Sequence, residues 1–188
     1  MTTPSIEKIG LVYDYSTQGE WALAAALELG RTCRAVLNVY YFLESPYGVP
    51  HDLTPANLPI HQYDRATLVQ TERKLREHFE ERLGDFEDVR FRICESGRHN
   101  RELRRCLLHH EYRLLIIPHL RAGSSFGNMP IEEFAYRFAA PVLLVGPDRQ
   151  NQFWLNRFAA VVNNSRPLIS GDWLDITEPK QLQTQPVL

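Results

Sequence analysis

Short apolar runs alternate with helix-forming segments from residue 6 to residue 145, and this alternation restricts the fold more than any other feature of the chain. The apolar or alternating runs span residues 6–13, 34–42, 88–95, 114–117 and 142–145. The segments between them are rich in Ala and Leu or carry apolar residues at helical spacing, at residues 20–30, 64–83, 98–110 and 131–138. With right-handed crossovers, this order gives a parallel sheet with helices on both faces. The sequence therefore predicts a doubly wound α/β fold with five parallel strands.

The same runs predict which strands lie inside the sheet. Residues 114–117 (LLII) and 142–145 (VLLV) are apolar on both faces, which favours central positions. Residues 89–94 (VRFRIC) alternate, which is typical of a strand at a sheet edge that is exposed on one side. Because residues 142–145 form the last strand, their edge would stay open unless a second copy of the chain covered it. The alternative is a cover made by the aromatic residues Phe153, Trp154 and Phe158.

The composition argues against several classes of protein. The formal net charge of -2 gives no basic surplus for a phosphate backbone, so we expect no nucleic-acid partner. No apolar run approaches the roughly 20 residues that span a bilayer, and no signal-like segment opens the chain, so we expect a cytoplasmic protein with no membrane partner. The three cysteines are odd in number and lack C-x-x-C spacing, which predicts reduced thiols.

Two regions interrupt the pattern of strands and helices. Prolines and a glycine between residues 44 and 61 exclude regular helix and predict an exposed loop after the second strand. After Pro147 the alternation stops. We therefore interpret residues 1–148 as one domain and residues 149–188 as a C-terminal extension that is partly packed at first and then disordered.

Two stretches of the chain resemble the universal stress protein family. Residues 9–42 (IGLVYDYSTQGEWALAAALELGRTCRAVLNVYYF) are similar to that family's first strand ending in Asp, its Ser-bearing turn, its Ala/Leu-rich helix and its second strand. Residues 95–147 (ESGRHNRELRRCLLHHEYRLLIIPHLRAGSSFGNMPIEEFAYRFAAPVLLVGP) are similar to its Gly-headed helix, fourth strand, loop, fourth helix and final Pro-Val-x-x-Val strand. The resemblance implies a Rossmann-like sheet of the adenine nucleotide alpha hydrolase type in the order 3-2-1-4-5. It also implies a homodimer formed through the last strand, and an adenine-nucleotide site in some members.

The implied ligand site lies where the sheet's connections diverge. In an open parallel sheet of this order, the crevice opens at the carboxyl ends of the first and fourth strands. Asp14 matches the family's strand-one Asp that contacts adenosine, Val39 the strand-two position whose backbone meets adenine, and Gly97 the glycine after the third strand. Asp14 would equally cap the helix beside it through its acceptor oxygens. The residues leave both interpretations open.

The phosphate half of that site departs from the family pattern. ATP-binding members carry G-x2-G-x9-G-[S/T], in which glycines let backbone N–H groups approach phosphate. Here Pro118 and Arg121 stand at the first two glycine positions. Met129 and Pro130, after seven intervening residues instead of nine, replace the final Gly-Ser/Thr pair that opens the fourth helix. Proline has no N–H, and the other side chains add bulk. We therefore expect ATP with Mg²⁺ to bind weakly or not at all.

Side chains of the same loop offer a different anion site. His119 and Arg121 would supply cations, and Ser124 and Ser125 would supply hydroxyl donors, to an anion or to a weakly bound adenine nucleotide such as AMP. The alternative interpretation of these four residues is a solvated surface loop.

Motifs for catalysis are missing from the sequence. The chain lacks G-x-S-x-G, G-x4-G-K-[S/T] and any His/Cys spacing of a metal site, so we expect no enzyme, no metal and no resident cofactor. A hydrolase or nucleotidyl-transferring activity would rest on fold analogy alone. The sequence favours a non-catalytic stress-response or regulatory module that acts through dimerisation and partner contacts. The alternative is a sensor that binds an adenine nucleotide or another anion at the Asp14/His119 crevice.

Overall fold

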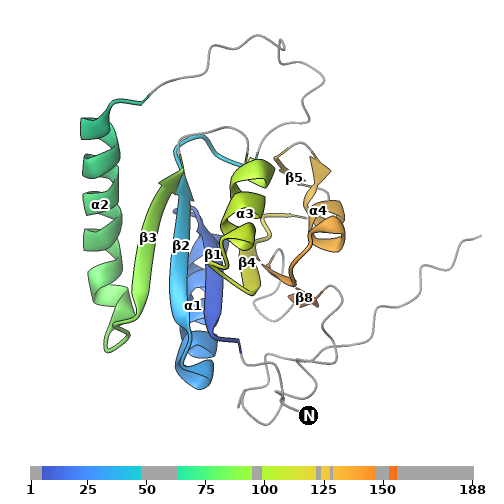
Figure 1. Cartoon of the computed structure of the whole chain (residues 1–188), viewed down its shortest axis with the longest axis horizontal. Helices are drawn as coiled ribbons and strands as arrows, with labels where there is room; N and C mark the ends of the chain where they lie inside the picture. The colour runs from blue at the N-terminus through green and yellow to red at the C-terminus, as the bar shows by residue number, and fades with distance from the viewer. Residues whose placement is uncertain are drawn as a thin grey trace, which may run out of the picture.

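The computed structural model describes residues 6–47, 63–94, 99–121, 124–127, 129–146 and 153–155. Residues 153–155 are described by their backbone alone. Within these residues a twisted sheet is flanked by helices on both faces (Figure 1). The helices are α1 (Thr17–Cys33), α2 (Arg65–Leu83), α3 (His99–Leu108) and α4 (Ile131–Arg137). The strands are β1 (Lys8–Tyr13), β2 (Val36–Phe42), β3 (Val89–Cys94), β4 (Leu114–Pro118), β5 (Ser125–Phe126), β6 (Met129–Pro130), β7 (Val142–Val145) and β8 (Phe153–Leu155).

The main sheet has the strand order β3-β2-β1-β4-β7-β8, and the first five of these strands are parallel. The predicted order 3-2-1-4-5 is therefore confirmed, with β7 as the fifth strand. β4 lies between β1 and β7, as its apolar run predicted, and β3 lies at the edge.

Two antiparallel pairings add to the parallel strands. The first agrees with the alternative in which Phe153 and Trp154 cover the last parallel strand, and the second was not predicted. β8 pairs with β7 through the partners Leu143 with Leu155 and Val145 with Phe153, so the edge of β7 is covered within the chain. β5 and β6 form a separate two-stranded ladder in the loop after β4, where the sequence predicted no strand. Strands of two or three residues are too short to show a periodic pattern. The homodimer was predicted because β7 would otherwise leave an open edge, but β8 pairs with that edge. The homodimer itself stays a prediction.

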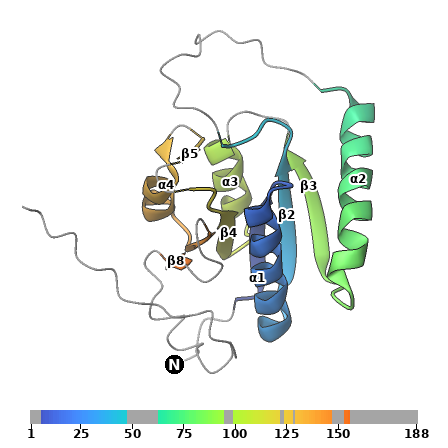
Figure 2. The same ribbon diagram turned by 180° about the vertical axis from the view of Figure 1, so that it is seen from behind.

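Two apolar cores lie on opposite faces of the sheet. α1 and α2 pack on one face, seen in front in Figure 2, and α3 and α4 pack on the other. Neighbouring residues of one strand point into different cores, as Ile116 and Ile117 of β4 do. This division explains why β4 and β7 have continuous apolar sequences, since both of their faces are buried.

Local signals set the ends of the helices. The hydroxyl of Ser16 accepts the N–H of Gly19 at 2.9 Å and caps α1, and the carboxylate of Asp64 accepts the N–H of Thr67 at 2.6 Å and caps α2. α1 ends at Arg34, whose φ of 52° is left-handed. Among the described helices, none is both long enough and apolar enough to cross a membrane.

Candidate functional site

The chain reverses its direction of winding at the carboxyl ends of β1 and β4. β1 leads into α1 on one face, and β4 leads through the β5–β6 loop into α4 on the other face (Figures 1 and 2). Neighbouring parallel strands whose connections diverge in this way leave a crevice beyond their ends, where doubly wound proteins bind ligands. We call the space beyond the ends of β1 and β4 the crevice.

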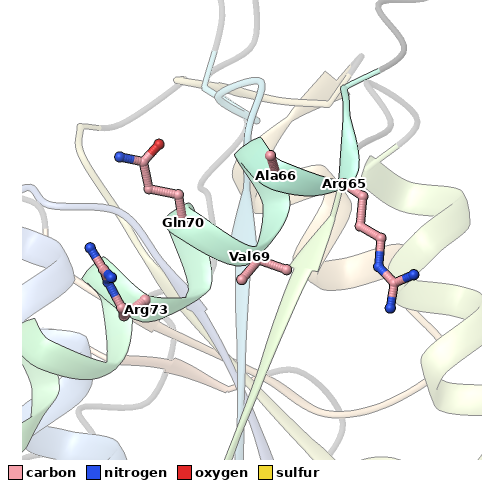
Figure 3. Close-up of a pocket in the computed structure, with 5 residues that line it drawn as sticks. All are labelled: Arg65, Ala66, Val69, Gln70 and Arg73. Carbon is pink, nitrogen blue, oxygen red and sulfur yellow. The ribbon is translucent and has the colours of Figure 1, made fainter.

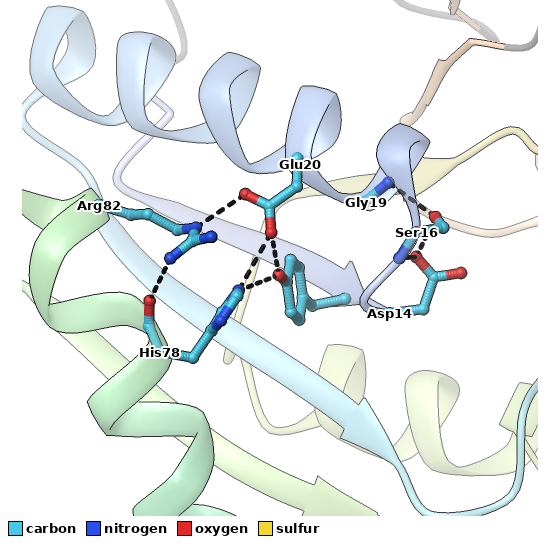
Figure 4. Close-up of polar contacts among 7 residues, drawn as sticks. Asp14, Ser16, Gly19, Glu20, His78 and Arg82 are labelled. Atoms are coloured by element: carbon cyan, nitrogen blue, oxygen red, sulfur yellow. Dashed lines mark hydrogen bonds and ion pairs between the residues drawn. The ribbon is translucent and has the colours of Figure 1, made fainter.

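Asp14 lies at the β1 side of the crevice and is engaged by the first turn of α1. Its Oδ1 accepts the hydroxyl of Ser16 at 2.5 Å and the backbone N–H of Ser16 at 3.2 Å (Figure 4). Ser16, in turn, caps Gly19. The capping role considered for Asp14 therefore belongs to Ser16, and Asp14 holds that cap in place. Contact of Asp14 with a ligand stays a prediction.

The residues after β2 cross to the β4 side of the crevice. Figure 1 shows this cyan stretch running from the end of β2 towards the start of α3 and β5, and we call residues 44–47 the crossing segment. Its Glu44 carbonyl lies 2.8 Å from Nε2 of His99 at the start of α3. Its Pro46 carbonyl accepts the N–H of Gly127 at 2.8 Å. The sequence predicted an exposed loop here, which is wrong for Pro46, because that residue is buried.

Tyr47 places its ring and hydroxyl at the end of β4. The hydroxyl donates to the carbonyl of Pro118 at 2.6 Å. The ring meets Phe126 edge to face, with the ring centroids 5.4 Å apart, and packs on the α3/α4 core. Burial raises the pKa of the Tyr47 phenol, and the nearby Asp14 carboxylate raises it further. Tyr47 is therefore a neutral donor that lies between the two predicted halves of the site.

His119 is buried beside the crevice. Its side chain is 3% exposed, and its Nε2 lies 3.0 Å from Oε1 of Glu132 at the start of α4. In the described part of the chain, Nδ1 of His119 and Oγ of Ser124 are buried and have no hydrogen-bond partner. The contact of Nε2 with a carboxylate favours the tautomer protonated at Nε2, which leaves Nδ1 as an acceptor. Two buried polar atoms are thus available to a small polar ligand.

The remaining predicted site residues are scattered. Val39 is fully buried in the α1/α2 core in the middle of β2, three residues before the strand ends. Arg121 is exposed, and the Ser125 hydroxyl lies 3.5 Å from the carbonyl of Gly127. Gly97 lies outside the described residues. Asp14 and His119 therefore follow the ends of β1 and β4, on either side of the crevice, and Val39 lies in the α1/α2 core.

Tyr47 and Glu132 lie at the crevice but were not predicted as site residues from the sequence. Both are ordinary in sequence, because Tyr47 follows a proline in a loop and Glu132 lies in the first turn of a helix, where acidic residues are common. Their positions depend on contacts across 71 and 13 residues of sequence, respectively. No local pattern reports such contacts.

A second polar cluster joins the two helices on the opposite face. Tyr13 of β1 donates to Oε1 of Glu20 at 2.5 Å, and Nε2 of His78 lies 2.6 Å from the Tyr13 hydroxyl and 3.0 Å from Oε1 of Glu20 (Figure 4). Because the Glu20 carboxylate only accepts, its contact with Nε2 favours the His78 tautomer that is protonated at Nε2. Arg82 donates to the other oxygen of Glu20 at 2.9 Å. Glu20 of α1 thus contacts both His78 and Arg82 of α2, so this cluster holds the two helices together.

Two surface grooves lie away from the crevice. Among the described residues, one open groove of about 610 Å³ is lined by the first half of α2, and Figure 3 shows its Arg65 and Arg73 pointing in different directions. Another, of about 380 Å³, lies on the β2/β3 face, where Arg92 pairs with Glu111. Within the described part of the chain, no three His, Cys, Asp or Glu side chains form a group that could hold a metal ion.

Comparisons with known proteins support the fold. No family model matches the chain, and no curated protein does. Solved structures do match. A universal stress protein from Archaeoglobus fulgidus in complex with dAMP is 11% identical, with a TM-score of 0.50 over 75% of this chain and 98% of that one. A universal stress protein family member from Burkholderia pseudomallei is 22% identical, with a TM-score of 0.46 over 76% of this chain and 98% of that one. At 11% identity the likeness to the Archaeoglobus fulgidus structure shows the fold alone, and this chain has a fold like that of this universal stress protein.

Proposed function

We propose that this chain is a non-catalytic stress-response or regulatory protein of the cytoplasm, which acts by contacts with protein partners and with a second copy of itself. The observation that supports this proposal best is Tyr47, which occupies the β4 side of the crevice and bonds to the backbone of Pro118. A triphosphate at this place would have to displace the phenol, and the loop offers Pro118 where a glycine, and Pro130 where a Ser or Thr, would meet phosphate.

Titration calorimetry of the whole chain with ATP and Mg²⁺ tests the ligand side of this proposal. We expect no binding in the low micromolar range, and no release of phosphate from ATP on prolonged incubation. The Asp14→Asn variant serves as the matched comparison, because it keeps the size of the side chain and an oxygen that accepts from Ser16. Low-micromolar affinity for ATP in the wild type that is lost in this variant would refute the proposal.

Self-association is the part of the proposal that the resemblance supports. The parallel strand β7 is covered by β8, so a dimer through the last strand would use the outer edge of β8 or another surface. Light scattering at micromolar concentration is expected to give twice the chain mass of 21.8 kDa. A mass of one chain at that concentration would remove the dimer from the proposal.

A second candidate function is a sensor for a small polar ligand. It is favoured by the two buried atoms without partners, Nδ1 of His119 and Oγ of Ser124. Mass spectrometry of small molecules released from freshly purified, denatured protein separates the two candidates. A stoichiometric adenine compound would favour the sensor, and its absence would favour the partner-binding protein.

A further inference from the structure

The crossing segment is held on the crevice by backbone and side-chain contacts at three points. Glu44 reaches His99, Pro46 reaches Gly127, and Tyr47 reaches Pro118, so the segment bridges α3, the β5–β6 loop and the end of β4. Only the contact of Tyr47 with Pro118 involves a strand of the main sheet, and Tyr47 makes it through its side chain. The sheet therefore does not need the crossing segment in order to form.

The side chain of Tyr47 has the shape and the hydrogen-bonding group that an adenine ring would bring to this place. It presents a flat aromatic ring against Phe126 and a donor to a backbone carbonyl at the carboxyl end of a central strand. An adenine ring is also flat, and its amino group is also a donor that suits a carbonyl oxygen. The phenol of Tyr47 is held in its protonated, donating form by burial, as described above.

Withdrawal of the crossing segment would free several polar groups together. The Pro118 carbonyl and the Gly127 N–H would lose their partners. Within three residues of them in sequence, Nδ1 of His119 and Oγ of Ser124 have no partner among the described residues. Acceptors and donors would then line one side of the vacated space. Such a set suits a nucleoside or a mononucleotide, which carries an amino group, hydroxyls and, for the nucleotide, an anion.

We propose that residues 44–47 are an internal competitor for the crevice, in which Tyr47 stands in for an adenine ring, so that adenosine or AMP binds only when Tyr47 withdraws. This inference rests on the second candidate function, the sensor. When the competent state is a fraction of the population, the apparent dissociation constant rises by the inverse of that fraction. The crossing segment would thus set the ligand concentration to which the protein responds.

Calorimetric titration of AMP into the wild type and two Tyr47 variants tests the competitor. Tyr47→Phe keeps the ring and removes the bond to Pro118, and we expect AMP to bind about 2- to 10-fold more tightly, the range of one hydrogen bond. Tyr47→Ala also empties the place of the ring, and we expect a gain of roughly tenfold or more. Tyr136→Phe is the matched control, because Tyr136 is 68% exposed on α4 and its variant should bind as the wild type does.

Two further readouts separate the parts of the proposal. Adenosine should gain affinity as AMP does in the Tyr47 variants, whereas ribose 5-phosphate, which lacks the flat ring, should not. In Tyr47→Phe without ligand, hydrogen exchange at the Gly127 amide should be faster than in the wild type, because the crossing segment withdraws more often and that amide then loses its Pro46 acceptor. Should Tyr47→Ala fail to fold, Tyr47→Phe and the Gly127 exchange still decide the question.

The outcomes that overturn the proposal are distinct. Equal AMP affinity in the wild type and both Tyr47 variants would reduce Tyr47 to a packing residue and leave the sensor standing. An equal gain in affinity for ribose 5-phosphate in the Tyr47 variants would refute the idea that Tyr47 takes the place of an adenine ring. Absence of binding by all probes to all variants would refute the competitor and the sensor together, and the partner-binding function would remain, because it is tested by ATP titration and light scattering.

Discussion

Replacing Gly19 by alanine should destabilise the protein, although alanine normally stabilises a helix. Gly19 lies in the first turn of α1, near Asp14, the residue that follows β1 (Figure 4). A Cβ on Gly19 would lie 2.1 Å from the backbone oxygen of Asp14 and 2.5 Å from its Oδ1. A backbone atom at the end of a buried strand has little freedom to retreat. Either β1 or the start of α1 would have to shift.

The magnitude follows from three terms. The helix propensity of alanine over glycine favours the variant by about 1 kcal/mol in a helix interior, and by less in a first turn. Overpacking costs about 1–3 kcal/mol, and displacement of the Ser16 cap costs about 0.5–2 kcal/mol. The net expectation is a loss of about 1–3 kcal/mol in the free energy of unfolding, or about 2–10 °C in Tm for a domain of this size.

Urea unfolding followed by circular dichroism measures this loss, with Gly30→Ala as the matched control. A Cβ at Gly30 would lie 2.8 Å from the ring of Phe86, which is a half-buried side chain able to turn aside. We expect Gly30→Ala to change stability by less than Gly19→Ala. A Gly19→Ala variant that is as stable as the wild type would show that Asp14 is not held by the start of α1, and the geometry assigned to this side of the crevice would be wrong.

Three further predictions concern the helices and thiols. Ser16→Ala should lower the free energy of unfolding by about 0.5–2 kcal/mol in urea titrations, because Gly19 loses its capping acceptor. Burial raises the pKa of Glu20, but hydrogen bonds from Tyr13, Arg82 and His78 outweigh it and hold the pKa below its ordinary value of 4.5. The stability lead of the wild type over Glu20→Gln should therefore be complete above pH 4.5 and shrink as the pH falls below it, as measured by urea titration at several pH values. Burial raises the pKa of Cys94 to about 12 and that of Cys106 to about 11, so iodoacetamide at pH 8 should alkylate both slowly in the native protein and fast in urea, as read by mass spectrometry.

The parallel sheet was predictable because each strand carries its position in its own sequence. LLII and VLLV are apolar on both faces and lie inside the sheet, while VRFRIC alternates and lies at the edge. Burial on two faces or on one is a local property of the side chains, so a single sequence reports it. The short strands β5, β6 and β8 form because longer elements hold them in place, and their own residues show no such pattern.

The candidate site was predictable only in part, for a related reason. Asp14 and His119 were found because they follow strands whose ends must meet in a doubly wound sheet. Tyr47 was not found, since its place depends on where a proline-containing segment crosses after β2. Hydrogen bonds with His99, Gly127 and Pro118 and the ring contact with Phe126 fix that crossing. None of these contacts has a signature in the residues around Tyr47.

The proline at position 118 connects the altered loop with the crossing segment. β4 pairs with β1 only through Leu114 to Ile116, so the missing N–H of Pro118 costs no bond to β1. On its other side, β4 pairs with β7 as far as Val145, and the next N–H, that of His119, donates to the Val145 carbonyl at 2.7 Å. Proline is therefore tolerated by the sheet while its carbonyl stays free to accept from Tyr47. One residue thus removes a donor that a phosphate would use and supplies the acceptor that holds Tyr47 in the crevice.

For this reason, the variant Pro118→Gly alone should not bind ATP, because Tyr47 would still donate to the same backbone carbonyl. Calorimetric titration with ATP measures this. Low-micromolar affinity in Pro118→Gly would show that the missing N–H donor, and not the phenol of Tyr47, keeps the triphosphate out.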